Sequence, residues 1–235
     1  MLMIRELTVN YGSFLAVDGV DLTVNRGEIV GLIGPNGAGK TSILQVIAGI
    51  VAPTRGRVFY EDELINHSDP RDRLASGIVL VPETRGVFGM MSVYENLLVG
   101  AYSCKERVEI RGRMDRVFRL FPILAERRRQ LVNTMSGGQQ QMVAIASGLM
   151  GAPRLLVLDE PSIGLAPVVI KDIANTLSTL RDDGLTILLS EQNAKLATSI
   201  SDRIYVVQAG RIQMTRSTKG LDDDPEFVES FLSLS

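Results

Sequence analysis

The 235-residue chain is long enough for one large domain with a sizeable hydrophobic core. Its 45% apolar and 22% charged residues are usual for a soluble globular protein, and its net charge of −2 provides no basic field to attract nucleic acid or anionic lipid. The longest apolar runs are far shorter than the roughly 20 residues that span a bilayer. Met1–Asn10 lacks the apolar core of a signal peptide, and the single Cys104 allows no internal disulfide. We therefore expect a cytoplasmic protein that reaches a membrane only through partners.

The first part of the chain, residues 1–84, is predicted to consist mainly of strands. Leu7–Val9 and Val20–Val24 alternate like half-buried strands around a turn at Tyr11-Gly12-Ser13. Glu28–Ile33 is almost continuously apolar, as expected for a strand that is covered on both faces. The same reasoning predicts a helix at Thr41–Ile50, a strand pair at Arg57–Ile65 and a buried strand at Gly77–Val81.

The middle segment, from about residue 85 to residue 150, contains no strong buried strand. Lys105–Arg119 is highly charged and has helical apolar spacing, and a further helix is predicted at Gln139–Leu149. We expect this segment to form a mostly helical subdomain that is inserted between strands of the core.

The last segment, residues 151–235, contains two predicted buried strands, Arg154–Leu158 and Leu185–Leu189. Pro167 opens a helix between them and Gly184 closes it. The apolar side chains of this helix fall on one stripe, at Val169, Ile173, Leu177 and Leu180. This βαβ order makes at least part of the sheet parallel. The prediction is one α/β domain, 1–235, in which 1–84 and 151–235 form the core and a β-subdomain.

The most specific motif is G-P-N-G-A-G-K-T at Gly34–Thr41, which matches G-x-x-x-x-G-K-[ST]. Its glycines allow several backbone N–H groups to face one point at a helix N-terminus, and this arrangement favours an anion. Lys40 adds a positive charge for the β- and γ-phosphates, and the Thr41 hydroxyl can bind Mg²⁺. A Gly-rich turn without a ligand is the alternative, but the buried strand before the loop and the helix after it favour a phosphate site.

Two adjacent carboxylates end another buried strand, in L-L-V-L-D-E-P at Leu155–Pro161. A carboxylate there can reach a metal at the neighbouring phosphate loop, so Asp159 is a candidate Mg²⁺ ligand, directly or through water. Glu160 is a candidate general base for an attacking water. A helix N-cap or a solvated acidic turn would be the better interpretation of an isolated pair, and the phosphate loop reverses that preference.

A third motif is M-S-G-G-Q-Q-Q at Met135–Gln141, which places a Ser-Gly-Gly turn before a predicted helix. The unobstructed amides favour an anion at this second helix N-terminus, although an ordinary N-cap has the same pattern. Two phosphate-type sites in different subdomains suggest that each nucleotide is held between two subunits.

The strand predicted near Leu185 continues into a run of polar residues, T-I-L-L-S-E-Q-N at Thr186–Asn193. Ser190, Glu191, Gln192 and Asn193 do not suit the interior of a buried strand. We therefore expect the strand to stop before them and a polar cluster to lie beyond its end.

In chain order, G-P-N-G-A-G-K-T resembles the Walker A loop of ABC transporter ATP-binding subunits, M-S-G-G-Q-Q-Q resembles the family signature, and L-L-V-L-D-E-P resembles the Walker B strand. The resemblance covers essentially the whole chain. It implies a RecA-like P-loop core with an antiparallel β-subdomain and an inserted helical subdomain, and a head-to-tail pair that hydrolyses ATP with Mg²⁺. The implied nucleotide contacts of one subunit are Gly34, Pro35, Asn36, Gly37, Ala38, Gly39, Lys40, Thr41 and Ser42. The other subunit would face them with Ser136, Gly137, Gly138 and Gln139.

Other residues occupy positions to which the family gives a role. Tyr11 is where an aromatic ring stacks on adenine, with a plain core or turn tyrosine as the alternative. Glu83 replaces the usual Gln that touches Mg²⁺ and senses the membrane partner, and Ser162–Pro167 lacks the usual Asp of the D-loop. Gln192 stands where a switch His contacts the γ-phosphate. A Gln can donate an N–H but cannot titrate, so Glu160 would act as base without a histidine.

These departures together resemble the smaller ATPase of high-affinity branched-chain amino-acid importers, with importers of urea or short amides as the alternative. The resemblance implies transmembrane permease subunits docked near Glu83–Met91, a second ATP-binding subunit (a sister or another copy) and, indirectly, a periplasmic binding protein. The chain would then be peripheral on the inner face of the cell membrane. Less favoured are a soluble ABC-type ATPase, which usually has fused cassettes or basic tails, and a non-hydrolysing regulatory module, which would have lost Lys40, Asp159 or Glu160.

Overall fold

The computed structural model describes residues 1–218 and contains a six-stranded and a four-stranded sheet. The six-stranded sheet has the order β10-β9-β3-β8-β7-β6, with β10 antiparallel to its neighbour and the other pairs parallel. This confirms the parallel sheet predicted from the βαβ unit. Its strands are β3 (Ile29–Ile33), β6 (Ile78–Val81), β7 (Leu155–Asp159), β8 (Thr186–Glu191), β9 (Arg203–Gln208) and β10 (Arg211–Ser217).

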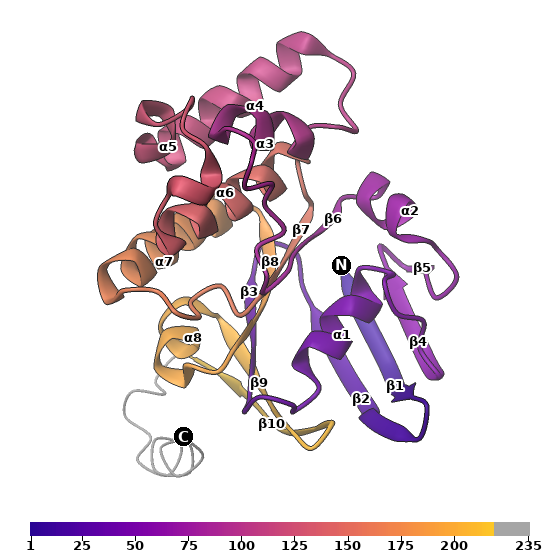
Figure 1. Cartoon of the computed structure of the whole chain (residues 1–235). Helices are drawn as coiled ribbons and strands as arrows, with labels where there is room; N and C mark the ends of the chain where they lie inside the picture. Colours follow the sequence, from indigo (N-terminus) through magenta and orange to yellow (C-terminus); the bar gives the residue numbers. More distant parts are fainter. Residues whose placement is uncertain (219–235) are drawn as a thin grey trace.

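The four-stranded sheet is antiparallel and has the order β2-β1-β4-β5. Helix α1 (Lys40–Ile47) lies between the two sheets (Figure 1), and its Ile43, Leu44 and Ile47 belong to the same apolar cluster as residues of both. The strands are β1 (Leu2–Tyr11), β2 (Phe14–Val24), β4 (Arg55–Tyr60) and β5 (Glu63–Leu64). Burial of α1 between two sheets fixes the direction of its N-terminus, where the phosphate loop enters.

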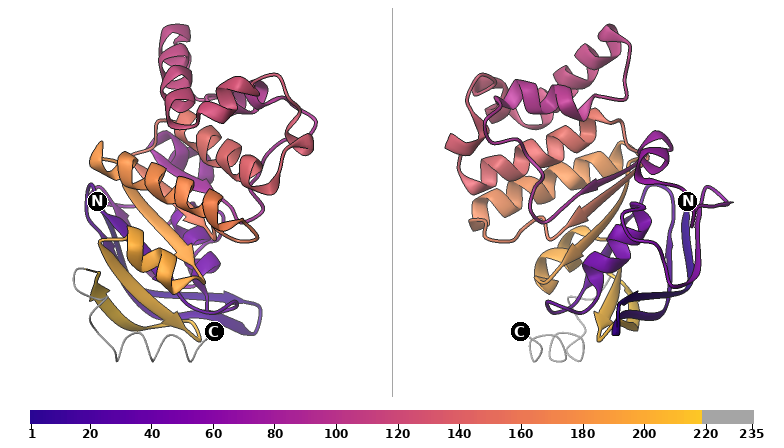
Figure 2. Two further views of the ribbon diagram at one scale, coloured as in Figure 1. Left: turned by 90° about the vertical axis from the view of Figure 1, so that its left-hand side faces the viewer. Right: turned by 45° about the vertical axis from the view of Figure 1, so that its right-hand side comes forward.

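Helical elements alone occupy the chain between β6 and β7, as predicted, and they form one end of the molecule (Figure 2). Helices α6 (Gly137–Met150) and α7 (Pro167–Asp182) lie side by side and share an apolar cluster with Leu156 and Leu158 of β7. The other helices of this segment are α3 (Val93–Gly100), α4 (Arg107–Leu120), α5 (Pro122–Glu126) and a 3₁₀ turn at Val132–Thr134. No helix in residues 1–218 is long and apolar enough to cross a bilayer.

Two parts of the fold differ from the sequence-based expectation. Strand β8 does not stop before the polar run, because Ser190 and Glu191 are its last residues and are 0% and 1% exposed. The prediction of a strand end at Leu189 was therefore wrong, since hydrogen bonds from neighbouring elements satisfy these polar groups inside the sheet. The sequence reasoning also missed four elements: β9, β10, α2 (Pro70–Ala75) and α8 (Ala194–Ile200). The C-terminal part of the predicted core, 219–235, lies outside the described residues.

Candidate active site

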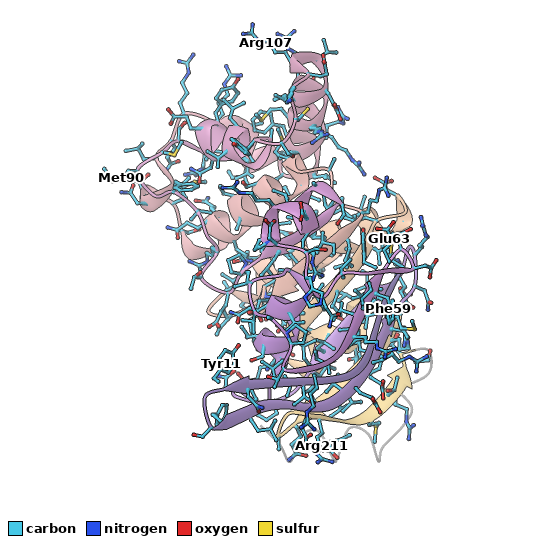
Figure 3. All side chains as sticks on the ribbon, turned by 90° about the vertical axis from the view of Figure 1, so that its right-hand side faces the viewer. Tyr11, Phe59, Glu63, Met90, Arg107 and Arg211 are labelled. Atoms are coloured by element: carbon cyan, nitrogen blue, oxygen red, sulfur yellow. The ribbon has the colours of Figure 1, made fainter. Side chains whose placement is uncertain are left out.

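A cleft of about 280 Å³ lies where the loop before α1 faces the β1–β2 hairpin. Figure 3 shows Tyr11 at the turn end of that hairpin. The cleft collects side chains from four separate parts of the chain, two of which are the motifs at Gly34–Thr41 and Leu155–Pro161. Its lining residues are Tyr11, Phe14, Ala16, Asn36, Gly37, Ala38, Gly39, Lys40, Thr41, Ser42, Glu83 and Glu160.

Lys40 begins α1, and its side chain turns back into the preceding loop. Its Nζ donates to the carbonyl oxygens of Gly34, at 2.6 Å, and Pro35, at 3.1 Å, and pairs with Glu160 Oε1 at 2.9 Å. The ammonium group has three N–H donors, so these three acceptors use all of them. Lys40 is only 4% exposed, so water has little access to it. An entering phosphate would replace two neutral carbonyls and compete with Glu160 for the same charge.

Close backbone packing explains two glycines of the loop. A Cβ on Gly34 would lie 2.1 Å from the carbonyl oxygen of Val207, and a Cβ on Gly39 would lie 2.5 Å from that of Ala16. Gly39 also has a φ of 102°, which is strained for other residues. Since α1 begins after Gly39 without a side-chain cap, the amides of its first turn can bind an anion.

Asp159 ends β7 with its carboxylate held by two hydroxyl groups. Its Oδ1 accepts from Ser190 Oγ at 2.6 Å and from Thr41 Oγ1 at 3.2 Å. Hydroxyl and carboxylate oxygens suit Mg²⁺, which is usually bound by one or two carboxylates together with water and substrate phosphate. Among residues 1–218 no three His, Cys, Asp or Glu side chains form a group that could hold a metal alone. Thr41 and Asp159 therefore fit a Mg²⁺ ion that a bound phosphate completes.

Glu160 has a φ of 48°, which is uncommon for a non-glycine residue. Its amide donates to the carbonyl oxygen of Ser190, at 3.2 Å, and to Ser190 Oγ, at 3.0 Å. Its buried carboxylate pairs with Lys40 through Oε1 and accepts from the Gln192 amide at 3.3 Å through Oε2. The strained backbone and the fixed carboxylate support a functional role for this residue.

The end of β8 lies beside these carboxylates. Gln192 reaches Glu160 only through its backbone amide, and its own side chain is exposed. The buried Glu191 carboxylate accepts from the amide of Ser162 at 3.1 Å and from its hydroxyl at 2.8 Å. Burial raises the pKa of Glu191 to about 7, the charge of Glu160 adds to the shift, and the hydrogen bonds from Ser162 oppose it.

Tyr11 and Glu83 both reach the cleft. Tyr11 is 45% exposed, and its hydroxyl donates to Ser42 Oγ and Gln45 Oε1, each at 3.3 Å, so that it stands against α1 at the rim. Glu83 lines the cleft from the loop after β6 and is exposed. Their contacts to adenine and Mg²⁺ stay predictions.

The residues predicted to act in trans lie outside this cleft, at the start of α6. Ser136 Oγ accepts from the Gln139 amide at 3.3 Å, and Gln139 Oε1 accepts from the Ser136 amide at 3.2 Å, which forms a capping box. The amides of Gly137 and Gly138 have no partner within the helix at such a position. This location is compatible with a nucleotide site shared between two subunits.

Ser190 was placed in the polar cluster by the sequence reasoning, which did not predict its contacts with Asp159 and Glu160. It lies opposite Asp159 in the β7–β8 pairing, where its hydroxyl reaches the carboxylate of Asp159 and the amide of Glu160. The usable signal was its position, because polar residues at the carboxyl ends of adjacent parallel strands meet at one edge of the sheet.

Two larger cavities lie near the start of β7, away from these groups, and one of them also reaches the start of β8. They measure about 590 and 550 Å³, and Arg113 and Arg154 line both. Neither contains a residue of the three motifs. The candidate site is therefore identified by the residues that line it, and not by the volume of the cavity.

Comparison with known proteins places the chain in a family. Residues 17–163 match the family described as ABC transporter, and this range contains all three motifs. The chain belongs to the ABC transporter family. It is an ABC-type ATPase, as predicted from the resemblance.

Two relatives and one solved structure illustrate this membership. The high-affinity branched-chain amino acid transport ATP-binding protein BraG of Pseudomonas aeruginosa is 40% identical over 232 residues, which is 99% of both chains. The lipopolysaccharide export system ATP-binding protein LptB of Haemophilus influenzae is 32% identical over 234 residues, 99% of this chain and 97% of LptB. The ADP conformation of MJ1267, an ATP-binding cassette of an ABC transporter, has a TM-score of 0.85 and 29% identity, covering 99% of this chain and 98% of MJ1267. The predicted ABC ATPase fold is thereby confirmed.

Proposed function

We propose that this ABC ATPase hydrolyses MgATP to drive the import of branched-chain amino acids through partner membrane subunits. The observation that carries the catalytic part is the convergence of Lys40, Asp159 and Glu160 beside the phosphate loop. The solute has a separate support, the 40% identity to BraG over almost the whole chain.

In this proposal the loop amides and Lys40 hold the β- and γ-phosphates, and Tyr11 contacts adenine. A Mg²⁺ ion bound at Thr41 and Asp159, with Glu83 nearby, would offset the phosphate charge. Glu160 accepts the proton of the attacking water. Its carboxylate already faces the loop through the Lys40 pair and the Gln192 amide, so ATP has only to displace the lysine.

The site is completed by a second ATP-binding subunit. The amides of Gly137 and Gly138 at its α6 N-terminus would meet the γ-phosphate, with Ser136 and Gln139 beside them. Because these contacts exist only in the closed pair, ATP favours closure and hydrolysis releases it.

The permease is proposed to dock near Glu83–Met91, the segment between β6 and α3. Phe88 and Met90 are exposed there, and Figure 3 shows Met90 on the outer surface of the helical part. A short cytoplasmic helix of the permease would cover these apolar side chains. The chain would then sit on the inner face of the cell membrane, and a periplasmic binding protein would act on it only indirectly.

The first experiment tests catalysis with Glu160→Gln in the purified full-length chain. Glutamine keeps the size of the side chain but cannot accept a proton, so we expect ATP turnover to fall by roughly 10²- to 10⁴-fold while MgATP still binds. Glu109→Gln, an exposed change in α4, is the matched control and should hydrolyse ATP like the wild type. Near-wild-type turnover of Glu160→Gln would refute the assignment.

A second experiment tests which solute is transported. The rival function is lipopolysaccharide export, which is the function named for LptB. The chain is reconstituted in liposomes with the permease subunits, the second ATPase and the binding protein encoded beside it. We expect leucine, isoleucine or valine to stimulate ATP hydrolysis, whereas stimulation by urea or short amides alone would support the alternative importer. No response to any of these solutes would contradict the import proposal.

A further inference from the structure

The last two residues of β8 hold both ends of a short segment that includes Glu160. We call Ser190 and Glu191 the β8 clamp. Ser190 accepts the amide of Glu160 through its carbonyl oxygen and its hydroxyl, and two residues later Ser162 donates both its amide and its hydroxyl to the Glu191 carboxylate. Pro161 lies between these two anchors and restricts its own φ.

The anchor at Glu191 matters because the loop that follows has few other attachments, the main one being Leu165, which packs against the apolar core. Ile163 and Ala166 are exposed, and the bonds from the Ile163 amide to the Glu160 carbonyl (3.2 Å) and from the Leu165 amide to the Ser162 carbonyl (3.2 Å) stay within the loop. The Glu191 carboxylate is therefore a buried attachment of this loop to the sheet.

A carboxylate at this position is costly for folding. Every residue of β8 is buried, and burial of an ionisable group disfavours its charged form. An apolar residue of similar size would avoid this desolvation cost. A glutamate in this place therefore calls for a role that a leucine could not perform.

We propose that Glu191 is a positioning residue for ATP hydrolysis, which fixes Ser162 and through it the direction of Glu160 and of the loop up to Ala166. Glu191 is not among the residues that line the cleft, so it would act through these groups. The backbone of Glu191 makes a separate link, because its carbonyl accepts the Gly34 amide at 3.3 Å. Side-chain substitutions leave that link intact, so the phosphate loop should keep its shape and its affinity for ATP.

The inference rests on the ATPase activity of the chain and not on the identity of the solute. Three variants of the full-length chain separate positioning from structural support. Glu191→Leu removes both hydrogen bonds and fills a similar volume with an apolar side chain. Glu191→Gln can still accept a hydrogen bond from the Ser162 amide and can donate one to the Ser162 hydroxyl. Ser162→Ala removes only the hydrogen bond of the hydroxyl. The measurements are kcat and KM for MgATP, the melting temperature, and amide exchange of residues 163–165 without nucleotide.

We expect Glu191→Leu to lower kcat by about tenfold or more, since small misplacements of catalytic groups cost this much, with KM changed by less than about threefold. Its melting temperature should equal or exceed that of the wild type, while residues 163–165 exchange faster. Glu191→Gln should keep most of the activity, Ser162→Ala should be intermediate, and the Leu and Ala changes combined should be less than additive.

Either of two kinetic results would overturn the proposal. One is Glu191→Leu with kcat within about twofold of the wild type. The other is equal loss in the Leu and Gln variants, because Gln preserves the proposed bonds. A wild-type chain that hydrolysed no ATP would contradict the ATPase assignment. The clamp could be tested even in that case, because unchanged amide exchange of residues 163–165 in Glu191→Leu would refute it.

Discussion

At the residue scale, the charges of Lys40 and Glu160 in the site offset each other. The Lys40–Glu160 pair is almost completely buried, so each partner offsets the desolvation of the other. The pair also keeps the proposed base beside the phosphate loop. In the proposed mechanism, ATP binding would transfer Lys40 to a phosphate and leave Glu160 as an uncompensated carboxylate, the state in which it could accept a proton.

Gln192 leads to the first residue-scale prediction. Its exposed side chain can donate to a phosphate oxygen, and losing one such donor should reduce ATP turnover of the assembled transporter by about tenfold or more in Gln192→Ala. Gln192→His should be tolerated, because histidine also offers an N–H at this position. Turnover is measured on the complex with its membrane partners. If alanine has no effect there, Gln192 is only a polar residue at the end of a strand.

The second residue-scale prediction concerns pH. Burial raises the pKa of Glu191 from its ordinary value of 4.5 to about 7, so between these values the folded chain holds a proton that the unfolded chain has released. The stability contributed by this proton is complete below pH 4.5 and is lost as the pH rises through about 7. Glu191→Gln cannot titrate. Its free energy of unfolding relative to the wild type should therefore be larger at about pH 8 than at about pH 5.

Urea denaturation of both proteins without nucleotide and with EDTA measures this difference. Comparison of the two proteins at each pH cancels the titration of all other groups that behave alike in both. A relative stability that is constant or smaller at the higher pH would show that Glu191 ionises normally in the folded chain.

At the element scale, the phosphate loop depends on the contact between the start of α1 and the β1–β2 hairpin. Gly39 allows this contact, since a Cβ there would lie 2.5 Å from the Ala16 carbonyl oxygen. The site edge of the sheet is built in the same way, from the ends of β7 and β8 in register. In both cases the close approach of two backbone segments determines where the side chains of the site lie.

Gly39→Ala tests this dependence. We expect a loss of stability on the order of 1–3 kcal/mol, because alanine is strained at a φ of 102° and meets a carbonyl oxygen. ATP affinity should fall as well, measured by titration calorimetry beside urea denaturation. Gly112→Ala in α4 is the matched control, since its Cβ would meet no atom within 4 Å and it should gain up to about 1 kcal/mol. Equal stability of Gly39→Ala and the wild type would exclude the proposed constraint.

An element can be predicted from the sequence when its own residues carry the pattern, and not when its structure depends on distant parts of the chain. Helix α7 and strand β7 were predicted well because a four-residue stripe or a continuous apolar run is a local signal. Helices α2 and α8 have six and seven residues, too few for a clear period, and β9 owes its place to pairing with β3. The burial of Ser190 and Glu191 was missed for a related reason, because their hydrogen-bond partners come from other elements.

At the scale of the whole molecule, two separate helix N-termini are proposed to bind phosphate, those of α1 and α6. They belong to different layers, and only the α1 site contributes to the cleft. A second subunit placed head to tail would bring the other N-terminus to the phosphates. Arg85 lies close to the α6 N-terminus, where a cation is electrostatically unfavourable unless an anion is present.

Gly137→Asp tests this arrangement in the Glu160→Gln background, in which bound ATP should persist. Asp at the start of α6 should leave the folded subunit as stable as before or more stable, because it complements the helix dipole and lies near the Arg85 guanidinium. In the pair, however, its carboxylate would face the γ-phosphate of the other subunit and repel it. We expect MgATP to produce dimers of the Glu160→Gln protein, and not of the double variant, in analytical ultracentrifugation. Gly137→Asn, a neutral control of the same shape, should retain most of the dimer. If the Asp protein dimerises at the same ATP concentration as its parent, the α6 N-terminus does not meet the nucleotide and the head-to-tail proposal fails.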